Sequence, residues 1–195
     1  MSKRDIIQGG LILFLIILVW SMLRFFVFTP IIIEDASMQP LLIKGEQVLV
    51  SKLTKIKRFD VVAFSDINNS KKSYVKRVIG LPGDEIYFMD DVLYINGEVV
   101  DEFYLEVHKQ KLADGELVTP DFNLEQLFKV KEVPKDRIFV LEDNRKKFKN
   151  IKDIALIKKK QLIGEVKFAF WPLKFFGPIT NSVEDPSEEV EAVNF

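Results

Sequence analysis

The sequence has no cysteine and only one histidine among its 195 residues. Cysteine nucleophiles, cysteine-rich zinc sites and sites with several histidine ligands are therefore excluded. A serine–histidine–aspartate triad would have to use His108, which stands in the polar stretch 107–111 and is expected to be a solvated loop histidine. If this chain cuts amide bonds by covalent catalysis, lysine is the expected base.

The sequence also lacks an excess of charge of one sign, since 28 basic residues stand against 29 acidic ones. A protein that binds nucleic acid should show a basic stripe on its surface, so we expect no nucleic-acid partner. The length supports one domain, or one core with a small appendage.

A long apolar run spans residues 6–28 and follows the basic residues Lys3 and Arg4. As a helix with about 1.5 Å per residue it reaches roughly 34 Å, enough for a hydrocarbon core of about 30 Å. A cleavable secretory signal is the alternative, but the run is long and lacks a small-x-small exit before Pro30. We therefore expect an uncleaved transmembrane anchor over 6–28, with residues 1–5 in the cytosol and the remainder outside the cell membrane.

Downstream of Pro30 the pattern is that of an all-β protein, with short runs of β-branched and aromatic residues between polar turns. It predicts strands over 46–50, 59–64, 74–79, 137–141 and 164–171, and a hairpin over 92–100 with Asn96-Gly97 at a type I′ turn. Residues 101–135 are polar and weakly patterned, with a short helix expected over 123–128, and are interpreted as a cap or insertion. The extracytoplasmic β domain is expected over 30–177, and the acidic segment 178–195 as a disordered tail.

Two residues in this pattern have side chains that could take part in catalysis, Lys76 and Ser37. Lys76 lies between Tyr74 and Val78 on one face of the predicted strand 74–79. If that face is buried, desolvation disfavours the ammonium, and a neutral amine could take a proton from a serine hydroxyl. The alternative is a lysine that snorkels from a half-exposed strand. Ser37 precedes a turn at Pro40, where its hydroxyl can be exposed and its N–H can face a developing oxyanion.

The order of these motifs resembles that of bacterial type I signal peptidases. Ser-Met-x-Pro at 37–40 follows the apolar run, and Tyr-Val-Lys-Arg-Val-Ile-Gly-Leu-Pro-Gly-Asp stands at 74–84. Phe-Asp-Val-Val at 59–62, Asp-Asn-Arg at 143–145 and Phe-Trp-Pro at 170–172 appear in the order of the family.

The resemblance implies an all-β Ser/Lys peptidase fold with Ser37 as nucleophile and Lys76 as general base, without metal or cofactor. Its substrates would be signal peptides of secreted preproteins, with small side chains at the first and third positions before the cut. Contact with membrane lipid is also expected, because an aromatic-rich stretch near the end of the domain suits the membrane interface. The alternative is that these side chains pack in the core. They are Phe168, Phe170, Trp171, Phe175 and Phe176.

The chain departs from the family pattern in the segment that follows the Asp-Asn-Arg motif. The family commonly reads Gly-Asp-Asn-Arg-x-x-Ser-x-Asp-Ser-Arg, whose serine orients the base lysine. Here the segment begins with Glu142, and an ungapped alignment places Phe148, Asn150, Ile151 and Lys152 at the last four named positions. Asn150 and Lys152 would form a weaker brace, because lysine lacks the planar fork of arginine.

A second departure is Asp35, where the family usually has serine or glycine. A carboxylate that faces the oxyanion site would oppose the developing negative charge; the alternative is a side chain that points to solvent. These departures leave open a signal-peptidase-like protein with weak or no proteolysis, which assists assembly of a secreted surface structure such as a pilus. Retention of both Ser37 and Lys76 argues against it. A self-cleaving Ser-Lys repressor would need a DNA-binding domain where this chain has its apolar run.

Overall fold

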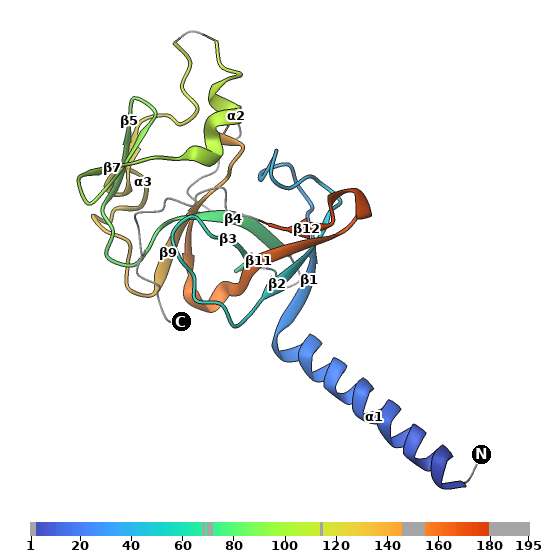
Figure 1. The fold of residues 1–195 in the computed structure, drawn as a ribbon. Coiled ribbons are helices and arrows are strands. Elements are labelled where there is room, and N and C mark those ends of the chain that lie inside the picture. Colours follow the sequence, from blue (N-terminus) through green and yellow to red (C-terminus); the bar gives the residue numbers. More distant parts are fainter. Residues whose placement is uncertain (1–2, 68, 70–71, 114, 146–154, 180–195) are drawn as a thin grey trace.

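The computed structural model describes residues 3–67, 69, 72–113, 115–145 and 155–179. Helix α1 (Lys3–Phe26) stands away from the sheets (Figure 1). Its apolar side chains between residues 6 and 22 are exposed. The segment Arg4–Met22 is long and apolar enough to cross a membrane. The predicted apolar helix is therefore present, and a helix with this uncovered surface suits a lipid environment better than water.

The main body is a curled antiparallel sheet with strand order β1-β2-β11-β3-β4-β9-β10, and β12 pairs with β11. This confirms the all-β prediction. The strands are β1 (Phe28–Ile32), β2 (Gln47–Ser51), β3 (Val61–Ser65), β4 (Ser73–Gly80), β9 (Arg137–Leu141), β10 (Leu156–Lys158), β11 (Leu162–Trp171) and β12 (Gly177–Pro178). Pro30 is tolerated in β1 because this strand is paired on one side only. Pro178, the first residue of the predicted tail, belongs to β12.

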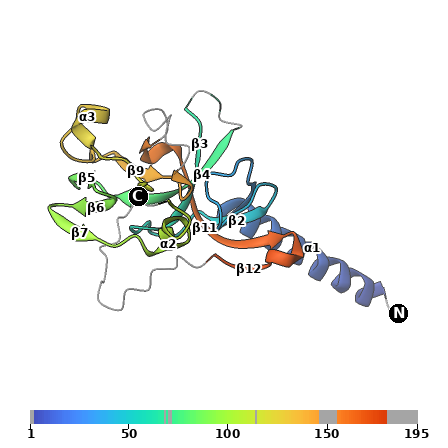
Figure 2. The ribbon, with the colours of Figure 1, turned by 90° about the horizontal axis from the view of Figure 1, so that it is seen from above.

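A second sheet, with order β7-β6-β5-β8, lies at the end of the molecule opposite α1 (Figures 1 and 2). Its strands are β5 (Ile86–Met89), β6 (Val92–Ile95), β7 (Glu98–Val100) and β8 (Phe122–Asn123). The predicted hairpin is confirmed: β6 pairs with β7, and Asn96 and Gly97 both have positive φ, as a type I′ turn requires. Because β5 begins at Ile86, this sheet starts before the expected insertion 101–135.

Short helical segments complete the described chain: η1 (Phe103–Leu105), α2 (Glu106–Lys109), α3 (Leu124–Phe128), η3 (Lys159–Gln161) and η4 (Leu173–Phe175). The helix expected over 123–128 is confirmed. It begins where the Asn123 side chain accepts a hydrogen bond from the Gln126 N–H at 2.8 Å, while the Gln126 side chain accepts from the Asn123 N–H. This reciprocal cap stabilises a helix of only five residues.

Strand β4 runs through the centre of the molecule and contributes to each hydrophobic cluster. Val75 packs with the cluster under β1, β2 and β11, Val78 with the cluster of β3 and β9, and Ile79 with the cluster under the small sheet. All its residues from Val75 to Gly80 are buried. A side chain on either face of this strand is therefore removed from water, which decides the environment of Lys76.

Candidate active site

Ser37 lies in the turn that follows β1 and is buried, with 3% of its surface exposed. The turn is anchored by Met38 and Leu42, whose side chains are fully buried in the cluster under β1 and β2. A distant segment also holds it: the Asn144 N–H donates to the Ser37 carbonyl oxygen at 2.8 Å, and Asn144 Nδ2 donates to the Ala36 carbonyl oxygen at 3.2 Å. The main chain beside the serine hydroxyl is thus fixed from two sides.

Lys76 is one of the most buried large side chains of the described structure, with 1% of its surface exposed. It faces Val62 across the β3–β4 pairing, and its Nζ lies 6.0 Å from the centre of the Tyr74 ring. The alternative of a lysine that snorkels from a half-exposed strand is therefore wrong. The structure supplies the burial on which the proposed base chemistry depends.

Two carboxylates face the Lys76 amine. Glu142 Oε1 lies 3.0 Å from Nζ and Asp35 Oδ2 lies 3.8 Å from it. Among the described residues Nζ has no hydrogen bond of normal geometry, so the contact with Glu142 is a close ion pair at an unfavourable angle. A buried ammonium requires such partners, because an unpaired charge away from water is costly.

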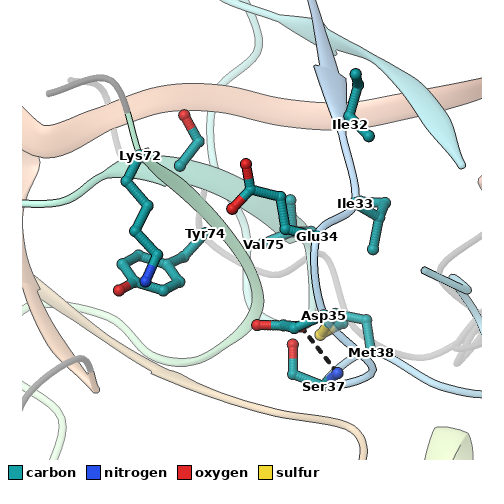
Figure 3. Close-up of a pocket in the computed structure, with 10 residues that line it drawn as sticks. Ile32, Ile33, Glu34, Asp35, Ser37, Met38, Lys72, Tyr74 and Val75 are labelled. Atoms are coloured by element: carbon teal, nitrogen blue, oxygen red, sulfur yellow. Dashed lines mark hydrogen bonds between the residues drawn. The ribbon is translucent and has the colours of Figure 1, made fainter. Parts of the chain in front are cut away.

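Asp35 contacts both members of the candidate dyad. Its Oδ1 accepts a hydrogen bond from the Ser37 N–H at 2.9 Å, shown as the dashed line in Figure 3, while Oδ2 faces Lys76. The side chain is about half exposed, at 51%. It therefore does not simply point to solvent. The same carboxylate occupies the N–H that an oxyanion at Ser37 would need and pairs with the candidate base.

A cavity of about 190 Å³ opens beside Ser37. One wall is formed by residues 32–35 at the end of β1, and the other by residues 72–75 at the start of β4 (Figure 3). Met38 and Ser37 lie at the end of the cavity near Asp35. The cavity has the dimensions of a slot for one or two small side chains rather than of a site for a large ligand. Within the described ranges, His, Asp and Glu side chains form no group of three or more that could hold a metal ion.

Behind the dyad, Arg77 and Asp143 form a buried bidentate pair. Arg77 Nε donates to Asp143 Oδ1 at 2.8 Å and Arg77 Nη2 donates to Oδ2 at 2.7 Å, while Nη1 donates to the Phe59 carbonyl oxygen at 2.8 Å. Because Arg77 follows Lys76 on β4 and Asp143 follows Glu142, this pair fixes the middle of β4 beside Lys76 to the segment after β9 beside Glu142.

Arg145 connects the same segment to the small domain, which is the second sheet together with η1, α2 and α3. Its guanidinium donates to Glu102 at 2.7 Å and to Thr119 Oγ1 at 2.9 Å, and all three side chains are buried. Tyr104 donates to Glu102, and burial, together with the Glu102 charge, raises the pKa of Tyr104 well above its ordinary value. The hydroxyl therefore stays neutral and remains a hydrogen-bond donor.

His108 differs from the prediction of a solvated loop residue. It lies in α2, is half-buried, and its Nε2 is 2.8 Å from the Gln39 carbonyl oxygen, two residues after Ser37. Because a carbonyl oxygen only accepts, Nε2 carries the proton in this contact. The ring thus fastens the small domain to the turn that carries Ser37, and this hydrogen bond goes to the main chain rather than to the serine hydroxyl.

Two further predictions concern the segment after the Asp-Asn-Arg motif and the aromatic stretch near the end of the domain. Phe148, Asn150, Ile151 and Lys152 lie outside the described residues, so the predicted weak brace stays a prediction. Of the aromatic stretch, Trp171, Phe175 and Phe176 are exposed while Phe168 and Phe170 are half-buried, and Phe168 packs edge-on against Phe176 with ring centres 4.8 Å apart.

The contact between Lys76 and Glu142 could have been found by pairing β4 with β9 in the sequence. Arg77 faces Leu141 and Val78 faces Val140 in this antiparallel pair, so the next step of the register places Glu142 opposite Lys76. The two predicted strands 74–79 and 137–141 contained this information, but the sequence pattern does not state which strands pair.

Comparison with known proteins gives a consistent result. A family model described as "Signal peptidase, peptidase S26" matches residues 6–171. A signal peptidase I from Bacillus caldolyticus is 45% identical over 167 residues, which cover 84% of this chain and 90% of that protein. A signal peptidase IB from Staphylococcus aureus (strain COL) is 34% identical over 182 residues, or 89% and 94% of the two chains. The crystal structure of a signal peptidase I from Enterococcus faecalis V583 is 37% identical, with a TM-score of 0.53, over 57% of this chain and 97% of that one.

Proposed function

The chain belongs to the signal peptidase family (peptidase S26), and we propose that it removes signal peptides from secreted preproteins with Ser37 as nucleophile and Lys76 as general base. One observation carries the assignment of the dyad. The buried Lys76 amine and the Ser37 main chain meet the same carboxylate, Asp35, and the same segment, 142–144. Two residues far apart in the sequence thereby share two neighbouring groups, and Ser37 and Asp35 line one small cavity.

The proposed reaction follows from the chemistry of this pair. A neutral Lys76 amine takes the proton of the Ser37 hydroxyl as the oxygen attacks the carbonyl carbon of the substrate. The negative charge that develops on the substrate oxygen is stabilised by the Ser37 N–H. The Lys76 ammonium then gives its proton to the leaving amine, and water hydrolyses the ester. Neither a metal nor a cofactor is needed for any of these steps.

The cavity beside Ser37 supports a substrate with small side chains before the cut. Its walls are strand ends, 32–35 and 72–75, between which an extended peptide can lie with alternate side chains toward the floor. At about 190 Å³ the cavity suits small side chains at the first and third positions before the cut, which face the same side of an extended peptide.

We also propose the membrane arrangement. Residues 1–5 lie in the cytosol, and the apolar run predicted over 6–28 anchors the chain through helix α1, which ends at Phe26. The extracytoplasmic domain runs from β1 to β12, with 101–135 in its cap, so it begins at Phe28 and includes Pro178 of the segment 178–195 that was predicted as an acidic tail. Helix α1 ends at Phe26, eleven residues before Ser37 (37 − 26), which limits their separation to about 40 Å even for a fully extended chain. The exposed side chains of Trp171, Phe175 and Phe176 support contact of the domain with lipid head groups.

The test uses the purified full-length protein in detergent and a peptide that contains a small-x-small signal-peptide site. Wild-type protein should cut after this site, and Ser37→Ala and Lys76→Ala should each abolish cleavage while thermal unfolding stays cooperative. Lys131→Ala, a change of an exposed lysine, serves as the matched control and should retain full activity. Cleavage by either dyad variant above the level of a contaminating protease would refute the assignment.

A second candidate function is supported by the hydrogen bond from the Ser37 N–H to Asp35. A site whose oxyanion donor is occupied by a carboxylate could bind a signal peptide without cutting it, and so act as an assembly factor for a secreted surface structure. In the same experiment, equal peptide binding by wild-type protein and Ser37→Ala, with no cleavage by either, would favour this function.

A further inference from the structure

The ion pair between Lys76 and Glu142 is built into the sheet. Glu142 follows the last residue of β9, and the register of β4 with β9 places it directly opposite Lys76. The buried bidentate pair of Arg77 with Asp143 holds the next position of both segments. The distance of 3.0 Å between Nζ and Oε1 is therefore set by the backbone and by a rigid neighbouring pair, rather than by two mobile surface side chains.

Glu142 is the nearest of the charged groups that face Lys76 in the described structure. Asp35, from the turn after β1, lies farther from Nζ at 3.8 Å and is half exposed, whereas the Glu142 side chain is 24% exposed. The partner of Lys76 on β3 is the apolar Val62, and on β4 itself the Tyr74 ring lies at 6.0 Å. Water screens the Glu142 interaction less than the Asp35 interaction, because it is shorter and more buried.

Resting on the proposed function, we propose that Glu142 is a positioning residue for the general base, which holds the Lys76 amine in the site. The ungapped alignment predicts phenylalanine, at position 148, where the family pattern has the serine that orients the lysine. Glu142 supplies a polar partner for the amine from the opposite strand. It acts through Lys76 and needs no contact with the substrate.

A carboxylate in this place has two opposite consequences for catalysis. It restrains the amine, which favours proton transfer from Ser37 once the amine is neutral. Its negative charge also attracts the ammonium form of the amine, which cannot accept a proton. A hydroxyl partner would restrain the amine without the second effect.

The decisive variant is Glu142→Gln, which removes the charge and keeps the shape of the side chain. We expect its profile of kcat/KM against pH to cross that of the wild type. The acid limb should move to lower pH, because an opposite charge near the amine is lost. The alkaline plateau should fall about two- to tenfold, because the amine is held less firmly. Glu98→Gln, an exposed carboxylate on β7, is the matched control and should leave both unchanged.

A uniform decrease of kcat/KM at every pH would mean that Glu142 only supports the fold. An unchanged profile of kcat/KM against pH would mean that Glu142 has no role. Either result overturns the proposal. Glu142→Asp tests the geometry: it keeps the charge at a shorter reach and should keep the acid limb closer to that of the wild type than Glu142→Gln does. Thermal unfolding of every variant, at the pH values of the assay, separates loss of folded protein from loss of rate.

A second measurement does not depend on cleavage. The unfolding temperatures of Glu142→Gln, Lys76→Met and the double variant should be non-additive, with the double variant more stable than the sum of the two single losses predicts. If neither the wild type nor any variant cuts the peptide, the proposed function fails, and Glu142 then positions no base. Additive unfolding temperatures in a protein that does cut would overturn the ion pair, and with it the proposal, while the peptidase assignment stands.

Discussion

Replacement of Asp35 by glycine is expected to speed cleavage about tenfold. The Asp35 carboxylate accepts a hydrogen bond from the Ser37 N–H at 2.9 Å in the substrate-free site. The same N–H is the donor available to the oxyanion that forms on the substrate. Every reaction cycle must therefore break the contact with Asp35 before the N–H can stabilise the transition state.

The expected size of this effect follows from the strength of the contact. A hydrogen bond to a charged group contributes about 1.5–3 kcal/mol to stability. Because 51% of the Asp35 side chain is exposed, water competes for the carboxylate and the lower end of this range applies. About 1.4 kcal/mol corresponds to a factor of ten in rate.

The assay is single-turnover cleavage of a small-x-small peptide by the full-length protein, measured at neutral pH and on the alkaline plateau. Asp35→Asn is the matched variant: it keeps an acceptor for the Ser37 N–H but has no charge, so its rate should lie between those of the wild type and Asp35→Gly. A rate for Asp35→Gly equal to or below that of the wild type on the plateau, with an unchanged unfolding temperature, would refute the reasoning that this carboxylate blocks the donor.

Three further outcomes follow from contacts around the site. Asp143→Ala should lower the free energy of unfolding by about 3–5 kcal/mol, because it leaves the Arg77 guanidinium charged, buried and without its bidentate partner. Denaturant unfolding measures this loss. The loss should be much smaller in a double variant that also carries Arg77→Met. Burial raises the pKa of Asp60 from 3.8 to about 6, so the folded chain binds the Asp60 proton more tightly than the unfolded chain does. The stability linked to this proton is full below pH 3.8 and is lost as the pH rises to about 6. Asp60→Asn should remove this dependence and stabilise the protein at pH 7 by up to about 3 kcal/mol, as measured by denaturant unfolding at pH 4 and pH 7. His108→Ala should reduce kcat/KM about two- to tenfold, because it removes the hydrogen bond that fastens the small domain to the Gln39 carbonyl oxygen, in the turn that carries Ser37. An unchanged kcat/KM would show that this contact does not position the turn.

The sequence by itself determined those features that depend on neighbouring residues. The apolar run that becomes α1, the short run of β-branched and aromatic residues that becomes β4 and the Asn96-Gly97 turn of the β6–β7 hairpin are local patterns, and all three are present in the structure. The motifs around Ser37 and Lys76 also stood in the sequence and indicated the family. The strand β5 was missed because its four residues lie between polar turns, and too few positions remain to show an alternating pattern.

The tertiary structure alone decided the environment of the candidate dyad. Lys76 is buried because β4 has packed neighbours on both faces, which no pattern within residues 74–79 reveals. Glu142 faces it because β4 pairs with β9, more than sixty residues later in the chain (142 − 76 = 66). Asp35 turns back to the Ser37 N–H within a turn that Asn144 holds, and His108 reaches the same turn from the small domain. These contacts depend on which distant segments meet, and that is settled by the burial of three hydrophobic clusters rather than by local sequence.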